Sequence, residues 1–504
     1  MNDIDLLNFY NGECLDINEI PVLDMDKFRT AVIGEVESKA RIISLFVQPR
    51  EEKNFLMGIL AQNTGELAIL SAPVNDAYPA LTPYCHQAHL FEREIAEQWG
   101  IVPEGHPWLK PVRFHKSYST RDAWGRKDQD PILPGVTNYF EVQGEEIHEV
   151  AVGPVHAGII EPGHFCFQCH GENVLHLEIS LGFQHRGVEK SLIGGPDKLT
   201  IHQMETLAGD TTIGHCTAYA QAVESLAGCN LTARAHSIRG IALELERLAN
   251  HIGDLGALSG DIGYLPTASF CGRIRGDFLN MTALVCGNRF GRNLIKPGGV
   301  NFDIDQTMAE ELTTRIQKGL VEVTDAVSLM RLTPSVLARL EDTGVLSKEI
   351  CEDLGLVGLT ARACGLQRDV RFQFPSGIYT MAHIPLSTWE TGDAFARAYV
   401  RWLEIQKSCN FILEQLKSPP EGKIFKEIGA LPPEKLVVSL VEGWRGEICH
   451  TAATDKNGRF THYKIVDPSF HNWMGLAMAL RNEQISDFPL CNKSFNLSYC
   501  GHDL

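Results

Sequence analysis

The sequence predicts an α+β protein, in which a small N-terminal α/β domain is joined to a large, mainly helical domain with a peripheral antiparallel β region. Three observations predict this fold. Apolar, β-branched runs dominate residues 1–115, and a polar segment with Pro and Gly follows at 116–147. Apolar residues three and four positions apart then recur through much of 148–504. These ranges are the predicted first domain, linker and second domain.

The first domain is predicted to contain antiparallel strands followed by a helix. Charged or Asn/Gly breaks separate three apolar runs, at 40–49, 54–63 and 65–74. Residues 89–101 then have helical spacing, with Leu90, Ile95 and Trp99 on roughly one face.

The second domain is predicted to begin with a short β region at about 148–182 and to continue as a bundle with long central helices. Helical spacing marks three stretches, at 281–295, 309–330 and 391–416. Residues 435–455 alternate more like strands around a Gly-containing turn. From residue 467 we expect helix and then extended chain.

Composition restricts the classes of partner. The chain has 45 Lys and Arg against 63 Asp and Glu, a net charge of −18, which argues against nucleic acid or anionic lipid as the main partner. The start, MNDIDLLNFYNGECLDINEI, is acidic where a signal peptide is basic, and no run of about eighteen apolar residues occurs. We expect the 14 scattered cysteines to be reduced core thiols in a cytosolic protein.

A set of motifs runs in order along nearly the whole chain. They are GHPWLKPVRFH (105–115), GPVHAGIIEPGHF (153–165), LEISLGFQHRGVEK (177–190), HCTAYAQAVE (215–224), ELERLANHIGDLGALSGDIGY (244–264), KPGGV (296–300), TGDAFAR (391–397), EGWRGE (442–447) and DPSFHNW (467–473). The first resembles the closing signature of the thirty-kilodalton subunit of respiratory complex I. The others resemble the large subunit of complex I and, more closely, those of membrane-bound energy-converting [NiFe] hydrogenases of the formate hydrogenlyase type.

This resemblance implies an electron-transfer subunit of an ion-translocating oxidoreductase, peripheral on the inner face of the cell membrane. The implied partners are a small iron–sulfur subunit with a 4Fe–4S cluster, a ferredoxin-like subunit, and antiporter-like and other membrane subunits. We expect no directly bound cofactor, with a quinone or another redox partner as the electron acceptor. No G-x-G-x-x-G fingerprint follows a strand, so whether NAD(H) enters elsewhere in the complex stays open.

The nickel-binding cysteines that the resemblance implies are absent. Family hydrogenases hold nickel and iron with two C-x-x-C pairs, because thiolates suit a soft, redox-active site. Ala208 and Thr211 stand where the first pair belongs, and Ser498 and Gly501 stand where the second belongs, with Cys500 one residue off. Ala and Gly cannot coordinate through a side chain, and neutral Ser or Thr replaces thiolate poorly. We therefore expect no nickel–iron centre.

The quinone residues of complex I are also replaced. Family members that reduce quinone place a histidine in the first β-hairpin loop and a tyrosine near the first C-x-x-C position. Ile160 and Gly209 stand there in this chain. A nickel-free electron-transfer subunit is the leading hypothesis, and the alternatives are a hydrogenase with atypical ligands and a non-catalytic scaffold.

Five residues are candidates for the cavity. His156, Glu161 and His164 share the first hairpin loop, which in the family reaches toward the reaction cavity, and they could pass protons. The alternative is that they only bond the backbone of their loop. Asp210 and His215 belong to the remodelled cavity wall, where they either contact a ligand or fill and hydrate the vacated space.

Five further residues are candidates for a cofactor-facing role. In the family, His185 and Arg186 lie near the terminal iron–sulfur cluster of the partner, where a cation favours the reduced state. The alternative is an ion-pair network at a strand-to-helix corner. Glu246, Arg247 and His251 share a helix that borders the cavity, and a satisfied buried charge network is the interpretation that we favour for them.

One C-x-x-C pair occurs, and with the next residue it reads Cys166-Phe-Gln-Cys169-His170. Taken alone, this motif indicates c-type haem attachment, half of a zinc site or a redox thiol pair. It falls within the first hairpin, where alternating residues face opposite ways. We therefore interpret the cysteines as structural thiols.

Overall fold

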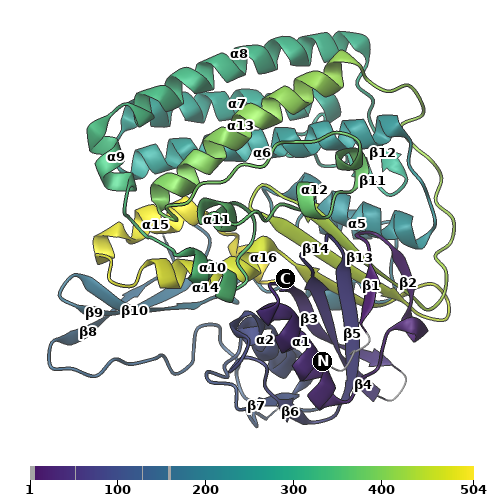
Figure 1. The fold of residues 1–504 in the computed structure, drawn as a ribbon, viewed down its shortest axis with the longest axis vertical. Coiled ribbons are helices and arrows are strands. Elements are labelled where there is room, and N and C mark those ends of the chain that lie inside the picture. The colour runs from purple at the N-terminus through teal and green to yellow at the C-terminus, as the bar shows by residue number, and fades with distance from the viewer. Residues whose placement is uncertain (1–5, 51–52, 128, 157–159) are drawn as a thin grey trace.

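The computed structural model describes residues 6–50, 53–127, 129–156 and 160–504 (Figure 1). Its N-terminal part is built on a four-stranded antiparallel sheet in the order β1-β5-β4-β3. The strands are β1 (Leu7–Phe9), β3 (Arg41–Arg50), β4 (Lys53–Ala61) and β5 (Leu67–Val74). Helices α1 (Met25–Glu37) and α2 (His89–Trp99) pack against this sheet. The three strands and the helix predicted here from the sequence are confirmed.

A second antiparallel sheet, in the order β15-β14-β13-β2, lies at the centre of the molecule. Its strands are β2 (Cys14–Asp16), β13 (Lys435–Glu442), β14 (Glu447–Thr454) and β15 (Phe460–Val466). Every residue of β14 is buried, as expected for a strand covered on both faces. Because β2 pairs with β13, a strand from the start of the chain completes a sheet formed near its end.

A third sheet projects to the side as an antiparallel ladder, visible at the lower left of Figure 1. It consists of β8 (Ile147–Val152), β9 (His164–His170) and β10 (Asn173–Ser180), within the predicted β region. The described residues between Glu104 and Ile147 contain no helix or strand. Two short two-stranded ladders complete the strands, β6 (Ala77–Pro79) with β7 (Val102–Glu104) and β11 (Ile295–Lys296) with β12 (Gly299–Val300).

Four long helices form the bundle that the sequence predicts. They are α6 (Ala233–Asp261), α7 (Leu265–Cys286), α8 (Gln306–Arg331) and α13 (Ala394–Lys417), side by side at the top of Figure 1. Side chains of Thr232, Asp305 and Asp393 cap the first turns of α6, α8 and α13 by accepting backbone N–H bonds. No helix of the described chain is long and apolar enough to cross a membrane.

Shorter helices connect these layers. They are α3 (Val188–Ser191), α4 (Thr200–Met204), α5 (Thr212–Leu226), α9 (Pro334–Leu340), α10 (Lys348–Asp353), α11 (Gly358–Ala363), α12 (Val370–Gln373), α14 (Pro468–Ala479), α15 (Phe488–Phe495) and α16 (Tyr499–His502). Four single 3₁₀ turns also occur among the described residues, η1 (Ile17–Glu19), η2 (His86–Ala88), η3 (Gly377–Thr380) and η4 (Ile485–Asp487). Helix α5 packs against β13 and β14.

Two secondary-structure predictions were wrong in part. The helix predicted over 281–295 ends at Cys286, because Gly287 takes a left-handed conformation (φ 75°) and closes the last turn. The tail was expected to end as extended chain, but α15 and α16 form there. Asn496, also left-handed, ends α15, and the Ser498 hydroxyl caps α16.

Candidate functional site

Two arginines join the segments that should carry the nickel cysteines. The guanidinium of Arg445 donates to both carboxylate oxygens of Asp210 at 2.7 Å, and its Nε donates to the carbonyl of Asn496. It also lies 3.9 Å from the centroid of the Trp444 ring. Bidentate pairing of this kind fixes geometry as well as charge. Arg445 thus ties the segment before α5 to the segment before α16.

Arg186 makes the second connection. Its guanidinium donates to the carbonyls of Thr206 (2.7 Å) and Leu207 (2.9 Å), and reaches the carbonyl of Cys500 at 3.5 Å. The same side chain therefore contacts both vacated cysteine segments. Its partner in the motif, His185, stacks on His115 and lies 3.1 Å from the carbonyl of Asp503.

The four nickel-cysteine positions do not fit a nickel–iron centre. The Thr211 hydroxyl donates to Asp210 and accepts from Arg445, while Ser498 accepts the N–H of Gly501 as a helix cap. A Cβ atom at Gly501 would lie 2.6 Å from the carboxyl carbon of Asp467, well inside van der Waals contact. A cysteine there requires Asp467 to move, so the space of the missing ligand is filled by a carboxylate.

That carboxylate begins a buried chain of hydrogen bonds. Asp467 Oδ2 lies 3.1 Å from His215 Nε2, His215 Nδ1 lies 3.1 Å from His450 Nε2, and His450 Nδ1 lies 2.9 Å from the Tyr463 hydroxyl. All four side chains are at most 1% exposed. With neutral imidazoles, donation runs in one direction, from Tyr463 to Asp467. These residues form a continuous buried chain of hydrogen bonds that ends at Asp467, beside Gly501.

The pKa shifts of Asp467 and His450 agree with this direction of hydrogen-bond donation. Burial alone would raise the pKa of Asp467, but the hydrogen bond from His215, with Arg445 nearby, holds it below its ordinary value. Burial and the neighbouring His215 lower the pKa of His450 well below its ordinary value, so its imidazole is neutral at pH 7. An ionised carboxylate at one end and a neutral imidazole within the chain are the states that the hydrogen bonds require.

Glu246 is a protonatable group on the other side of Asp210. Its carboxylate accepts the N–H groups of Ile213 (2.7 Å) and Gly214 (3.1 Å) at the start of α5. Burial, and secondarily the charge of Asp210, raise the pKa of Glu246 to about 8. It lines a narrow crevice with Asp210 and Arg289. A carboxyl with this pKa changes its protonation state near neutral pH.

Arg247 and His251 belong to a fully buried charge cluster. His251 Nε2 lies 2.7 Å from Glu404, and Arg247 pairs with Glu244 at 3.0 Å. The cluster contains three arginines and four carboxyls, Arg247, Arg362, Arg371, Glu244, Asp369, Glu404 and Glu442. All ionised, they would carry one excess negative charge. Burial and the neighbouring Asp369 raise the pKa of Glu442 to about 7, which lets it hold the neutralising proton.

Comparison with known proteins identifies the family. Residues 261–430 match the family model described as the respiratory-chain NADH dehydrogenase 49 Kd subunit, and residues 48–129 match the 30 Kd subunit. The carbon monoxide-induced hydrogenase of Rhodospirillum rubrum is 30% identical over 352 residues, which are 69% of this chain and 97% of that protein. This chain belongs to the complex I 49 kDa and hydrogenase large-subunit family.

Two further relatives show the same fused layout. Formate hydrogenlyase subunit 5 of Escherichia coli K12 is 29% identical over 445 residues, 84% of this chain and 76% of the relative. The NADH-quinone oxidoreductase C/D protein of Bacteroides thetaiotaomicron is 29% identical over 421 residues, 76% of this chain and 78% of the relative. The chain is therefore a fused 30 kDa- and 49 kDa-type subunit related to complex I and hydrogenases, and its relatives are oxidoreductase subunits.

The three candidate residues of the first hairpin loop, His156, Glu161 and His164, have different surroundings in the structure. Residues 157–159 of the loop lie outside the described residues. His156 lies 2.9 Å from the carbonyl of Gly163 in its own loop, and His164 packs against Tyr139. Glu161 accepts the N–H of Tyr499 at 3.4 Å and so contacts the second vacated cysteine segment. Among the contacts of the described residues, Glu161 is the loop residue that reaches the site.

The surroundings of the HRG motif and of the C-x-x-C-H motif bear on their roles. Burial, with Arg113 and His115 nearby, lowers the pKa of His185 to about 4, so Arg186 is the cation of its motif. Cys166 and Cys169 are buried free thiols on β9, three residues apart and therefore on opposite faces. Within the described ranges, no three or more His, Cys, Asp or Glu side chains are grouped to hold a metal ion.

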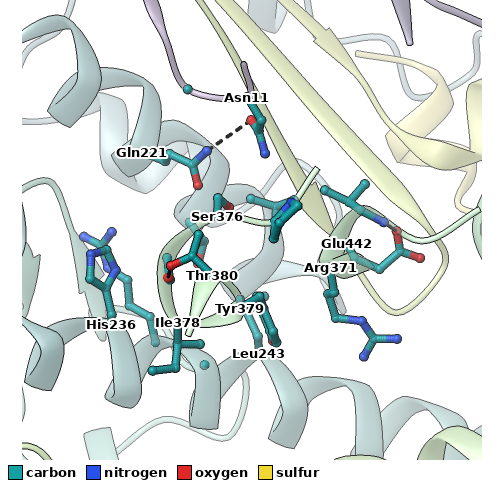
Figure 2. Close-up of a pocket in the computed structure, with 18 of the residues that line it drawn as sticks. Asn11, Gln221, His236, Leu243, Arg371, Ser376, Ile378, Tyr379, Thr380 and Glu442 are labelled. Atoms are coloured by element: carbon teal, nitrogen blue, oxygen red, sulfur yellow. Dashed lines mark hydrogen bonds between the residues drawn. The ribbon is translucent and has the colours of Figure 1, made fainter. Parts of the chain in front are cut away.

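A cavity of about 270 Å³ adjoins the buried charge cluster (Figure 2). Polar uncharged groups from distant segments line it, among them Asn11, Gln221 and Ser376, and Gln221 Nε2 donates to Asn11 Oδ1 at 3.2 Å. Arg371 and Glu442 form the side next to the cluster. None of the ten candidate site residues from the sequence lines this cavity.

Sequence reasoning missed His450, Tyr463 and Arg445 as site residues. His450 lies on β14 and Tyr463 on β15, where the sequence shows only strand-like alternation. Arg445 stood in the quoted EGWRGE motif, and its place between two strands was the available signal. His215 and Asp210, singled out from the motif order, lie near each other in the structure, with His215 bonded to Asp467 and His450 and Asp210 bonded to Arg445, and their functional role stays a prediction.

Proposed function

We propose that this chain is a nickel-free electron-transfer subunit of a membrane-associated, ion-translocating, complex I-like assembly. It would work on the inner face of the cell membrane beside a small iron–sulfur subunit with a 4Fe–4S cluster, a ferredoxin-like subunit and antiporter-like membrane subunits. The observation that carries the proposal is the set Ala208, Thr211, Ser498 and Gly501 at the ligand positions, with the Asp467 carboxylate in the space of the last.

Without a nickel–iron centre, the chemistry that this chain would supply is the uptake and release of protons. Glu246, with a pKa of about 8, holds a proton near neutral pH, and the nearby Asp210 carboxylate is neutralised by Arg445. The Asp467–His215–His450–Tyr463 chain offers a separate buried route. In the proposal, electrons pass from the clusters of the partner to the acceptor, and these groups take up or release the balancing protons.

The electron acceptor is proposed as a quinone or another redox partner. Ile160 and Gly209 do not fit the histidine and tyrosine that the complex I resemblance implies for quinone, so no catalytic step is assigned through those positions. Quinone-linked chemistry in this chain therefore requires other contacts than those of its complex I relatives.

Electron paramagnetic resonance of the complex, purified with its natural partners, tests the proposal. We expect iron–sulfur signals that change when a quinol is added and no hydrogen-dependent dye reduction. Hydrogen-dependent dye reduction would restore the hydrogenase alternative. Signals indifferent to quinol, together with unchanged complex activity in Asp210→Asn and His215→Gln variants, would favour the scaffold alternative.

A further inference from the structure

A second cavity is lined by residues from several elements, among them His502, the neighbour of Gly501. It has a volume of about 590 Å³ and is walled by α2, the segment 105–112, β10 and α14. It therefore opens at the junction between the 30 kDa-type and 49 kDa-type parts, whose elements lie side by side in the lower half of Figure 1. Small-molecule sites in proteins typically measure roughly 300–1,000 Å³. The cavity is large enough for a ligand of several rings.

Aromatic side chains make up much of its wall. The Trp108 ring is held in place by Lys110, whose ammonium lies 4.1 Å from the ring centroid, and by a 3.2 Å bond from its N–H to Glu178. Phe140 packs against His176 with centroids 4.7 Å apart. Trp473 is 3% exposed, and within the described chain its indole N–H has no hydrogen-bond partner. The wall thus offers aromatic ring faces to a ligand.

Two guanidinium groups face the cavity without a carboxylate partner among the described residues. Arg93 is fixed by its bonds to the carbonyls of Lys110 (2.9 Å) and Pro111 (2.8 Å). Arg481 is exposed at the end of α14 and makes no ion pair with any described residue. A chain with a net charge of −18 has many carboxylates available, so two unpaired arginines on one cavity indicate a site for an anion.

The carboxylates on the wall are already paired. Glu178 accepts from Lys110, from the Trp108 indole and from the backbone N–H of Phe140. Asp353 pairs with His86 at 2.7 Å. Neither carboxylate forms an ion pair with Arg93 or Arg481, although the charge of Glu178 acts on Arg93 from a longer distance. Both guanidinium groups therefore remain able to pair with an external anion.

The histidines of the wall add ring surface rather than charge. His106 accepts the N–H of Trp108 at Nδ1 (3.1 Å), so its proton is on Nε2, which faces the carbonyl of His89 at 3.1 Å. Burial lowers the pKa of His106 to about 4 and that of His89 to about 3. Both rings are neutral at pH 7, and Arg93 and Arg481 are the permanent positive charges on the cavity wall.

We propose that this cavity binds an aromatic ring bearing an anionic group, a carboxylate or a phosphate. The ring packs against Trp108 and Trp473, whose flat faces favour offset or edge contacts. The anion accepts from the arginines, whose planar forks match carboxylate and phosphate oxygens.

Isothermal titration of the full chain with 2-naphthoate, 1-naphthyl phosphate and the neutral 2-naphthamide tests the proposal. Whichever of 2-naphthoate and 1-naphthyl phosphate binds more tightly identifies the preferred anionic group. We expect 2-naphthamide to bind about tenfold more weakly than 2-naphthoate. The variants Arg93→Gln and Arg481→Gln should each weaken anion binding about tenfold. Arg292→Gln, at an exposed arginine off this cavity, should leave it unchanged.

Equal affinity for naphthoate and naphthamide in the unmodified chain would overturn the proposal without reliance on any variant. So would anion binding that survives both substitutions, or binding by the isolated chain that disappears in the assembled complex, since a partner subunit would then fill the cavity. These titrations are independent of nickel content and quinol response, so the proposal stands or falls separately from the proposed function.

Discussion

The substitution Glu246→Gln should make the stability of the protein less sensitive to alkaline pH. Glutamine retains an oxygen that can accept the N–H groups of Ile213 and Gly214 but carries no charge. The folded protein holds the Glu246 proton more tightly than the unfolded chain, because burial raises the pKa from 4.5 to about 8. The stability due to this proton is fully present below about pH 4.5 and is lost as the pH rises through 8.

The size of the effect follows from the two pKa values. Each pH unit between these two pKa values lowers the free energy of unfolding by about 1.4 kcal/mol. The total loss at pH 9, relative to pH below 4.5, is therefore at most about 5 kcal/mol. Glu246 is partly exposed to its crevice, so water reduces the penalty, and we expect about 2 kcal/mol. For a large domain this corresponds to roughly 2–4 °C in Tm.

Thermal unfolding at pH 6, 7.5 and 9 checks this prediction. The Tm of the Glu246→Gln variant should fall less between pH 6 and 9 than that of the unmodified chain. Glu310→Gln, at an exposed glutamate on α8, is the matched control and should leave the pH dependence unchanged. Identical pH profiles for Glu246→Gln and the unmodified chain would show that Glu246 is ionised throughout and would refute the reasoning.

Three further experiments, with four substitutions, test the site. Gly501→Ala forces a Cβ against Asp467 and should cost about 1–3 kcal/mol in chemical unfolding, and an unchanged unfolding curve would show that the space is open. His215→Gln and Asp467→Asn, combined in a double-mutant cycle, should show coupling of at least about 1 kcal/mol, and additivity would contradict the hydrogen bond between them. Arg371→Gln leaves buried carboxylates unpaired and should lower the free energy of unfolding by about 3–5 kcal/mol. A decrease no larger than that of the exposed control Arg292→Gln would show that Arg371 does not pair with these carboxylates.

Periodic patterns determined most of what the sequence could predict of the fold. Strands β3, β4 and β5 are long apolar runs with clear breaks, and α8 and α13 keep helical spacing over many turns. The pairing of β2 with β13 was not predictable, because residues more than four hundred positions apart meet in it and β2 is only three residues long. The end of α7 at Gly287 was also hidden in the sequence. Apolar residues continue on both sides of Gly287, but its left-handed backbone conformation ends the helix there.

The site was predictable where family motifs carried it and hidden where partners come from distant strands. Motif order singled out Asp210, His215 and the four positions that align with nickel cysteines, and their functional role stays a prediction. The partners of His215 are His450 and Asp467, 235 and 252 positions away, and no local signal pairs them. The carboxylate that fills the space at Gly501 likewise emerges only from the packing of α14 against α16.

Nickel analysis of the complex, purified with its natural partners, tests the central claim most directly. The account predicts iron from the clusters of the partner subunits and no stoichiometric nickel, because Thr211, Ser498 and Gly501 offer no thiolate and Asp467 occupies the space of the last ligand. One nickel per chain, retained through purification and exchange into chelator, would contradict it.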